Sequence, residues 1–190
     1  MNKTVKILVW IVGVLILGFL LFKFVAWPIM KKQTKKHSPE TETHITVDQT
    51  TIDVYYCSPS KKDRVIFGEL VPYDEVWRTG ANEPTRFVTN TDLTIGDQSL
   101  PAGEYTLWTL PGKDMWEVMF NSKIYEWGVS APSGKASREA EYDVVVVEVP
   151  PVLVDFVTED FTIELTEVGG NVIMDFRWDM TAVPVTIAID

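Results

Sequence analysis

Cysteine and histidine are scarce in this chain of 190 residues, which contains one cysteine, Cys57, and two histidines, His37 and His44. A single cysteine excludes an intramolecular disulfide bond, although it does not identify the cellular compartment. Zinc sites need several Cys or His ligands at close spacing, and none of these three residues has a second ligand so placed. We therefore expect no metal ion and no cofactor. Nucleophilic catalysis by Cys57 would need a basic partner such as His44, and a half-buried strand cysteine is the simpler interpretation.

Basic side chains are scarce beyond residue 44. The first 44 residues contain seven lysines against two glutamates, a net charge of +5, so the remaining residues hold 10 basic and 25 acidic side chains, a net charge of −15. Nucleic-acid binding needs clustered Lys and Arg, so this balance excludes a nucleic-acid partner. The same charge disfavours adhesion to an anionic lipid surface. It indicates a solvated protein surface that repels its own copies.

Only the N-terminus contains a long hydrophobic run, which covers residues 7–22 and, after one lysine, 24–30. At ~1.5 Å per residue a helix of this length can cross a hydrocarbon core of about 30 Å. Pro28 can end this helix. We predict an uncleaved single-pass membrane anchor at residues 1–30. The alternative is a cleaved signal peptide ending at Ala26, although the large side chain two positions earlier does not suit cleavage.

A polar and charged segment, residues 31–43, follows this anchor and contains a proline, so we expect a flexible linker there. The folded domain is predicted over residues 44–190. Four lysines directly after the anchor face two lysines and the amino terminus before it. The positive-inside rule therefore gives a near tie that slightly favours a cytoplasmic domain.

Helical periodicity is missing from every long segment after residue 44. Short stretches alternate between apolar and polar residues instead, as half-buried strands do. The clearest of them are His44–Val47, Thr51–Cys57, Thr85–Thr89, Glu104–Trp108, Trp116–Asn121, Phe161–Thr166, Val172–Trp178 and Val183–Ile189. The run Val144–Val147 suits a strand buried on both faces, and Pro184 suggests an edge strand. The sequence thus predicts an all-β fold, a single antiparallel β-sandwich-like domain preceded by one N-terminal transmembrane helix.

The least regular segment of the predicted domain, residues 64–87, contains four glycine or proline breakers. Within it we predict a binding surface at Trp77, Arg78 and Asn82. Trp77 offers a flat apolar face, Arg78 a planar fork of donors for a carboxylate, and Asn82 a donor and an acceptor. The ligand would be a small polar molecule, a glycan or a protein partner.

Two other hypotheses use the same segment. In a structural domain without a ligand, Arg78 pairs with Glu69 or Glu83, Trp77 fills the core and Asn82 caps a turn. In a hydrolase, Arg78 acts together with Glu69 or Glu83, although a chain this acidic always offers such carboxylates. Aromatic residues in alternating strands belong to the core more often than to a sugar-stacking platform, and we expect this of Trp108, Trp116 and Trp127.

Four pieces of the sequence together resemble the DUF2911 family of bacterial envelope-associated proteins. They are RVIFGELVPYDEVWRTGANEPT, LPAGEYTLWTLPG, WEVMFN and Trp127-Gly128, and the specific part is VWRTGAN at residues 76–82. The family has no assigned activity, so the resemblance assigns no catalytic residue. It implies a compact β-domain that is usually exported, which favours a domain outside the cytoplasm. The family commonly has basic residues in its valine-rich strand, whereas Tyr142–Val149 has none, so a role for charge on that strand is not expected here.

Overall fold

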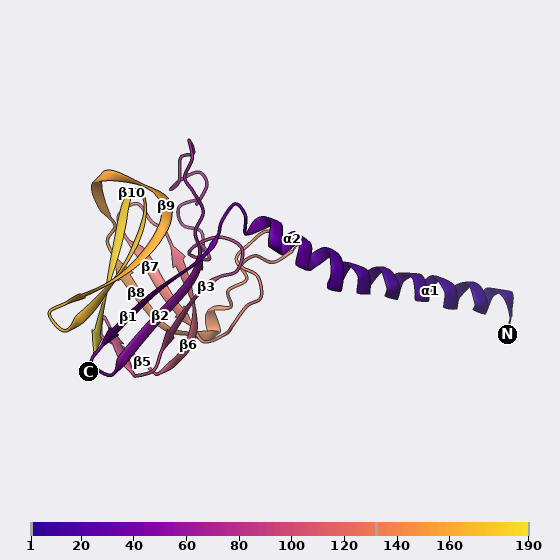
Figure 1. Cartoon of the computed structure of the whole chain (residues 1–190), viewed down its shortest axis with the longest axis horizontal. Helices are drawn as coiled ribbons and strands as arrows, with labels where there is room; N and C mark the ends of the chain where they lie inside the picture. Colours follow the sequence, from indigo (N-terminus) through magenta and orange to yellow (C-terminus); the bar gives the residue numbers. More distant parts are fainter. Residues whose placement is uncertain (1, 132, 190) are drawn as a thin grey trace. The chain divides into compact units, whose positions relative to one another are not determined.

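The computed structural model describes residues 2–131 and 133–189, and the chain forms two compact units that divide between His37 and Ser38 (Figure 1). The first unit is a helix with three parts, α1 (Lys3–Leu21), the π-helical turn η1 (Phe22–Ala26) and α2 (Trp27–Thr34). This N-terminal helix is long and apolar enough to cross a membrane, and a signal sequence would have the same character.

Pro28 does not end this helix, contrary to the sequence-based expectation. A proline ring clashes with the carbonyl four residues earlier and removes one N–H donor. The π-helical turn η1, directly before α2, widens the backbone where that clash would fall. The helix therefore continues to Thr34, and the first strand begins at Glu40, so both enter the segment 31–43 that the sequence predicted to be a flexible linker.

The second unit consists of two antiparallel sheets, which confirms the predicted all-β, sandwich-like fold. The first sheet has the order β1-β2-β3-β6-β7-β8 and the second β5-β4-β10-β9. The strands are β1 (Glu40–Val47), β2 (Thr50–Cys57), β3 (Thr85–Thr89), β4 (Leu93–Ile95), β5 (Gln98–Leu100), β6 (Gly103–Leu110), β7 (Trp116–Asn121), β8 (Asp143–Val149), β9 (Val152–Val168) and β10 (Asn171–Ile189). A 3-10 turn, η2 (Ala140–Tyr142), precedes β8. The long hairpin of β9 and β10 runs from orange to yellow in Figure 1.

The core lies between the inner faces of the two sheets. Alternate residues of each strand point inward, so one face of every strand supplies apolar side chains to it. The fully buried members include Ile52, Phe87, Leu107, Phe120, Ile163, Met174, Trp178 and Ile187. The two sheets of the second unit therefore share one core.

Two strands differ in detail from their sequence patterns. The valine run forms β8, an edge strand on which Val144 is 38% exposed while Val145 is fully buried, so only one face is covered. Pro184 lies in β10, which is flanked by β4 and β9 and is not an edge. Its missing N–H removes no ladder bond, because pairing with β9 ends at Ala182 and pairing with β4 starts at Ile187.

Candidate functional site

The irregular segment between β2 and β3 is fixed to the first sheet by backbone hydrogen bonds. Trp77 and Thr109 exchange two of them, with N···O distances of 2.7 and 2.9 Å, beside the end of β6. The Ala81 N–H donates to the Cys57 carbonyl at 3.2 Å. Gly80 adopts φ 145°, and a Cβ there would lie 2.9 Å from the same carbonyl oxygen, so glycine lets the segment cross close over β2. Trp77 to Asn82 is therefore an anchored part of the fold.

Trp77 lies in the core. The residue is 9% exposed, and its ring stacks on that of Trp178, with centroids 6.0 Å apart and planes 15° apart. It meets Phe161 edge to face at 5.0 Å, and its indole Nε1–H donates to the Gly80 carbonyl at 3.0 Å. The flat face of Trp77, which the sequence analysis predicted to bind a ligand, therefore packs on the Trp178 side chain.

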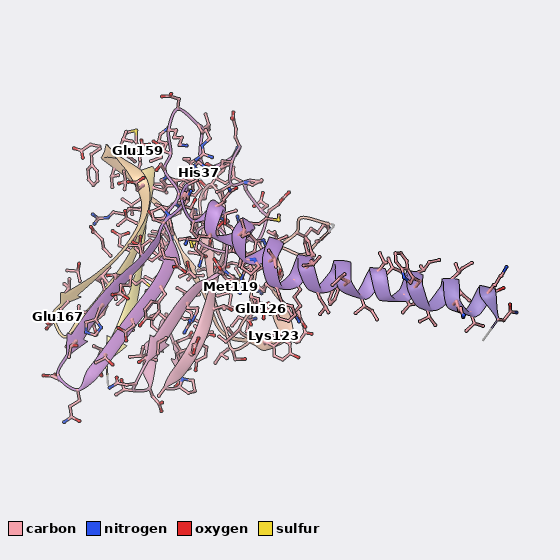
Figure 2. The ribbon with its side chains drawn as sticks, turned by 45° about the vertical axis from the view of Figure 1, so that its right-hand side comes forward. His37, Met119, Lys123, Glu126, Glu159 and Glu167 are labelled. Atoms are coloured by element: carbon pink, nitrogen blue, oxygen red, sulfur yellow. The ribbon has the colours of Figure 1, made fainter. Side chains whose placement is uncertain are left out.

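Asn82 serves as a turn residue that joins three segments. It adopts φ 60° and is 7% exposed, and asparagine tolerates this left-handed conformation better than most residues. Its carbonyl accepts the Gly128 N–H at 3.1 Å, and its Nδ2 donates to the Ser38 carbonyl at 3.5 Å. Asn82 therefore holds the loop between β7 and β8, whose Lys123 and Glu126 are labelled in Figure 2, against the Trp77 to Asn82 run.

Arg78 is the residue of this run whose side chain has a buried hydrogen-bond donor without an acceptor. Its stem passes over Gly128, where a Cβ would lie 2.0 Å from the Arg78 Cδ, so only glycine leaves room for it. Nε is buried and has no hydrogen-bond partner among the residues that the structure describes. Burial lowers the pKa of the guanidinium, and an electrostatic interaction with Cys57 opposes this shift. Arg78 is half-buried, so its positive charge is partly desolvated.

The two predicted carboxylate partners do not neutralise that charge. Glu69 is exposed in the turn before Val71. Glu83 is half-buried and its Oε2 accepts a long hydrogen bond from the Cys57 thiol, with an S···O distance of 3.8 Å. Within residues 2–131 and 133–189, neither carboxylate forms an ion pair with Arg78.

An open cavity of about 660 Å³ lies beside this cluster. The strands β1 and β2, the two residues before β3 and the start of β3 form it. Its residues are Glu40, Thr41, Glu42, Tyr55, Tyr56, Cys57, Glu83, Pro84 and Arg86. Of these, the sequence analysis identified only Glu83 as a site residue.

Of the three further tryptophans that the sequence analysis expected in the core, two lie in the interior. Trp108 is fully buried and Trp116 is 2% exposed. Trp108 packs edge to face against Tyr125 at 5.4 Å, and its Nε1–H donates to the Thr106 hydroxyl at 3.0 Å. Trp127 is half-buried. The described part of the chain brings no three His, Cys, Asp or Glu side chains together in a way that could hold a metal ion.

Comparison with known proteins gives one match. The family model described as "Protein of unknown function (DUF2911)" covers residues 38–187, which is nearly the whole second unit and excludes the N-terminal helix. No curated protein and no solved structure matches the chain.

Proposed function

We propose that this chain, which belongs to the DUF2911 family of proteins of unknown function, is a membrane-anchored envelope module that binds a small carboxylate-bearing ligand without catalysis. The resemblance at residues 64–128 had predicted this family. The proposed receptor for the carboxylate is Arg78, at the centre of the VWRTGAN run.

The single observation that carries this proposal is the half-buried side chain of Arg78, whose buried Nε has no partner in the described chain. Arginine keeps its charge in proteins. Burying a charge costs free energy unless the charge is paired, and folded proteins leave few buried polar groups unsatisfied. A carboxylate is planar and can accept two parallel N–H bonds from the guanidinium fork. A ligand carboxylate would therefore supply the acceptor and the negative charge that the fold does not provide for Arg78.

The other two hypotheses explain less. A hydrolase would need a carboxylate positioned with Arg78, but Glu69 is exposed and the Glu83 Oε2 accepts from Cys57. A purely structural domain accounts for Trp77 and Asn82, which are both buried. It does not account for Arg78, because a structural arginine would have an internal acceptor for its buried Nε.

Binding of a carboxylate probe tests this proposal. We expect propionate, titrated into the full chain in detergent micelles and followed by saturation-transfer NMR, to bind at least ~10-fold more tightly than its neutral isostere propionamide. Arg78→Gln is expected to abolish the difference. Arg78→Lys is expected to weaken it, because an ammonium group cannot form the bidentate contact.

Arg177→Gln is the matched control, since the Arg177 Nη1 already pairs with Glu164 at 2.9 Å and Arg177 does not line the cavity. This variant is expected to bind propionate as the unmodified chain does. Equal binding of propionate and propionamide, or an Arg78→Gln chain that still distinguishes them, would exclude Arg78 as the receptor.

The location of the domain is part of the same proposal. The apolar N-terminal helix and the resemblance to an exported family support a β-domain on the outer side of the membrane. Protease added to spheroplasts of a bacterial host is expected to digest the domain while a cytoplasmic marker stays intact. A domain that is protected until the membrane is lysed would place it in the cytoplasm instead.

A further inference from the structure

We infer that the β-domain docks onto the surface of a lipid bilayer through an apolar bulge, residues 152–157 of β9. This inference rests on one part of the proposed function, the membrane anchor, and is independent of the carboxylate site at Arg78. It adds a second contact with the membrane, made by the folded domain itself.

The apolar bulge exposes hydrophobic side chains in a fold that buries most others. Four of the six residues 152–157 are both apolar and exposed, namely Val152, Leu153, Phe156 and Val157. Leu153 is 79% exposed and Phe156 50%. Met180, in the facing part of β10, is exposed too. Single exposed apolar residues are ordinary on a protein surface, whereas a group of neighbours marks a contact surface.

The register of the β9–β10 hairpin explains why these side chains protrude. Leu153 pairs with Thr181 and Thr158 pairs with Asp179, so five steps along β9 face two steps along β10. The extra residues of β9 bulge out of the ladder. β9 is an edge strand of its sheet, but a bulged edge does not present the regular row of N–H and C=O groups that an added strand needs. The occupant of this surface is therefore not a β-strand of a partner.

The apolar bulge belongs to the end of the domain at which the chain enters. The Pro39 carbonyl, directly before β1, accepts the Ser58 N–H at 2.9 Å. The Ser58 hydroxyl donates in turn to the Phe161 carbonyl, four residues after the bulge, at 2.7 Å. Figure 2 shows Glu159, two residues after the bulge, well separated from Glu167 near the tip of the hairpin. The bulge and the start of β1 are thus joined by a short path of hydrogen bonds.

A short connection links this end of the domain to the predicted anchor. The N-terminal helix ends at Thr34 and β1 begins at Glu40, so five residues lie between them. A connection of this length spans at most about 20 Å when fully extended. A short tether also gives the second of two linked contacts an effective concentration on the order of mM. A shallow insertion of Leu and Phe side chains at the boundary of headgroups and acyl chains is then enough to hold the domain.

Charge favours a lipid surface over a second copy of the chain. The residues beyond 44 carry a net charge of −15, so two domains repel one another. Asp155 within the bulge and Asp160 just after it are exposed, and two bulges in contact would bring these carboxylates together. The same acidity disfavours an anionic bilayer. A zwitterionic phosphatidylcholine surface has no net charge and needs no hydrogen-bond register, so it fits the apolar bulge.

Spin labels at two valines of β9 test this inference. Val157, in the bulge, and Val168, near the hairpin tip, are both 55% exposed. Val157→Cys and Val168→Cys variants of the full chain carry a nitroxide and are placed one per phosphatidylcholine nanodisc. Oxygen collides with a label in lipid, and a nickel chelate with a label in water. We expect the oxygen-to-nickel collision ratio at 157 to exceed the ratio at 168 several-fold. The unmodified chain measures the background from the buried Cys57.

Two aspartate variants locate the contact. Leu153→Asp places a charge on the apolar bulge and is expected to lower the collision ratio at 157 to that at 168. Val168→Asp makes an equivalent change at the hairpin tip and is expected to leave the ratio at 157 as it is. Both side chains are exposed, so neither change disturbs the core.

The possible outcomes separate docking from anchoring. Equal collision ratios at 157 and 168, in chains that co-elute with the nanodiscs, would overturn docking and leave the anchor standing. A high ratio at 157 that survives Leu153→Asp would also overturn it. A label at 157 that is shielded from both reagents, and only in discs loaded with two chains, would assign the bulge to a second copy instead. A full chain that elutes apart from the nanodiscs would refute the membrane anchor itself.

Discussion

Trp178→Ala is expected to lower the free energy of unfolding by about 3–5 kcal/mol, the cost typical of removing a large aromatic side chain from a packed core. The Trp178 side chain is 1% exposed and stacks on Trp77. It also meets Phe161 at 5.9 Å and Phe67 at 6.4 Å, and its Nε1–H donates to the Glu159 carbonyl at 3.2 Å. Its removal is expected to leave a cavity where β9, β10 and the irregular segment meet. Such a loss is a large share of a typical stability of about 5–15 kcal/mol.

Urea unfolding of the full chain in detergent, followed by near-UV circular dichroism, measures this effect. Phe156→Ala is the matched control, because Phe156 is an aromatic residue of the same hairpin but is 50% exposed. It is expected to change the free energy of unfolding by no more than ~0.5 kcal/mol. If both variants lost the same stability, the aromatic cluster around Trp178 would not be what joins the irregular segment to the sandwich.

Much of the sheet structure was predictable because strand patterns are local. The alternation in Thr85–Thr89 and Trp116–Asn121 predicted the strands β3 and β7 with the bounds that the structure has. A run of valines gave a wrong prediction of burial for β8. The reason is that a continuous apolar run suits a strand covered on both faces, whereas β8 is an edge strand whose Val144 is left exposed. Which strands become edges depends on strand order, and no local pattern encodes strand order.

The candidate site was predictable in its residues and not in their roles. The breakers between residues 64 and 87 correctly marked an irregular segment. Trp77 was interpreted both as a ligand surface and as core, and the choice depends on its stacking with Trp178, which follows about a hundred positions later in the sequence. Likewise, the room for Arg78 is made by Gly128, in another loop. The cavity could not be found from the sequence, because its lining comes from two strands and the start of a third that only the sheet register brings together.

Arg78→Met is expected to make the unliganded domain more stable, a result opposite to that of removing a paired arginine. The Arg78 stem packs on Gly128, and methionine keeps most of that contact. The substitution removes a half-buried charged group whose buried Nε lacks a partner in the described chain. Leaving a buried donor unsatisfied costs about 1–3 kcal/mol, so a gain of that order is expected. For a domain of this size each kcal/mol raises the melting temperature by about 2–4 °C.

The pKa of Arg78 fixes how this gain depends on pH. Burial lowers the pKa, so the folded state disfavours the charged form. The resulting cost is fully present at any pH below the folded-state pKa and disappears only as the pH rises through it. The stability difference between Arg78→Met and the unmodified chain is therefore expected to stay constant across the neutral range.

Thermal unfolding of three variants of the full chain tests this prediction. Arg78→Ala removes the stem contact as well as the charge, so it is expected to melt below Arg78→Met. Arg86→Met alters an exposed arginine paired with Glu104 and is expected to change stability by no more than ~1 kcal/mol. A melting temperature of Arg78→Met below that of the unmodified chain would show that the guanidinium stabilises the free domain. A higher one, together with loss of propionate binding, would mean that this arginine is kept for its ligand at the expense of stability.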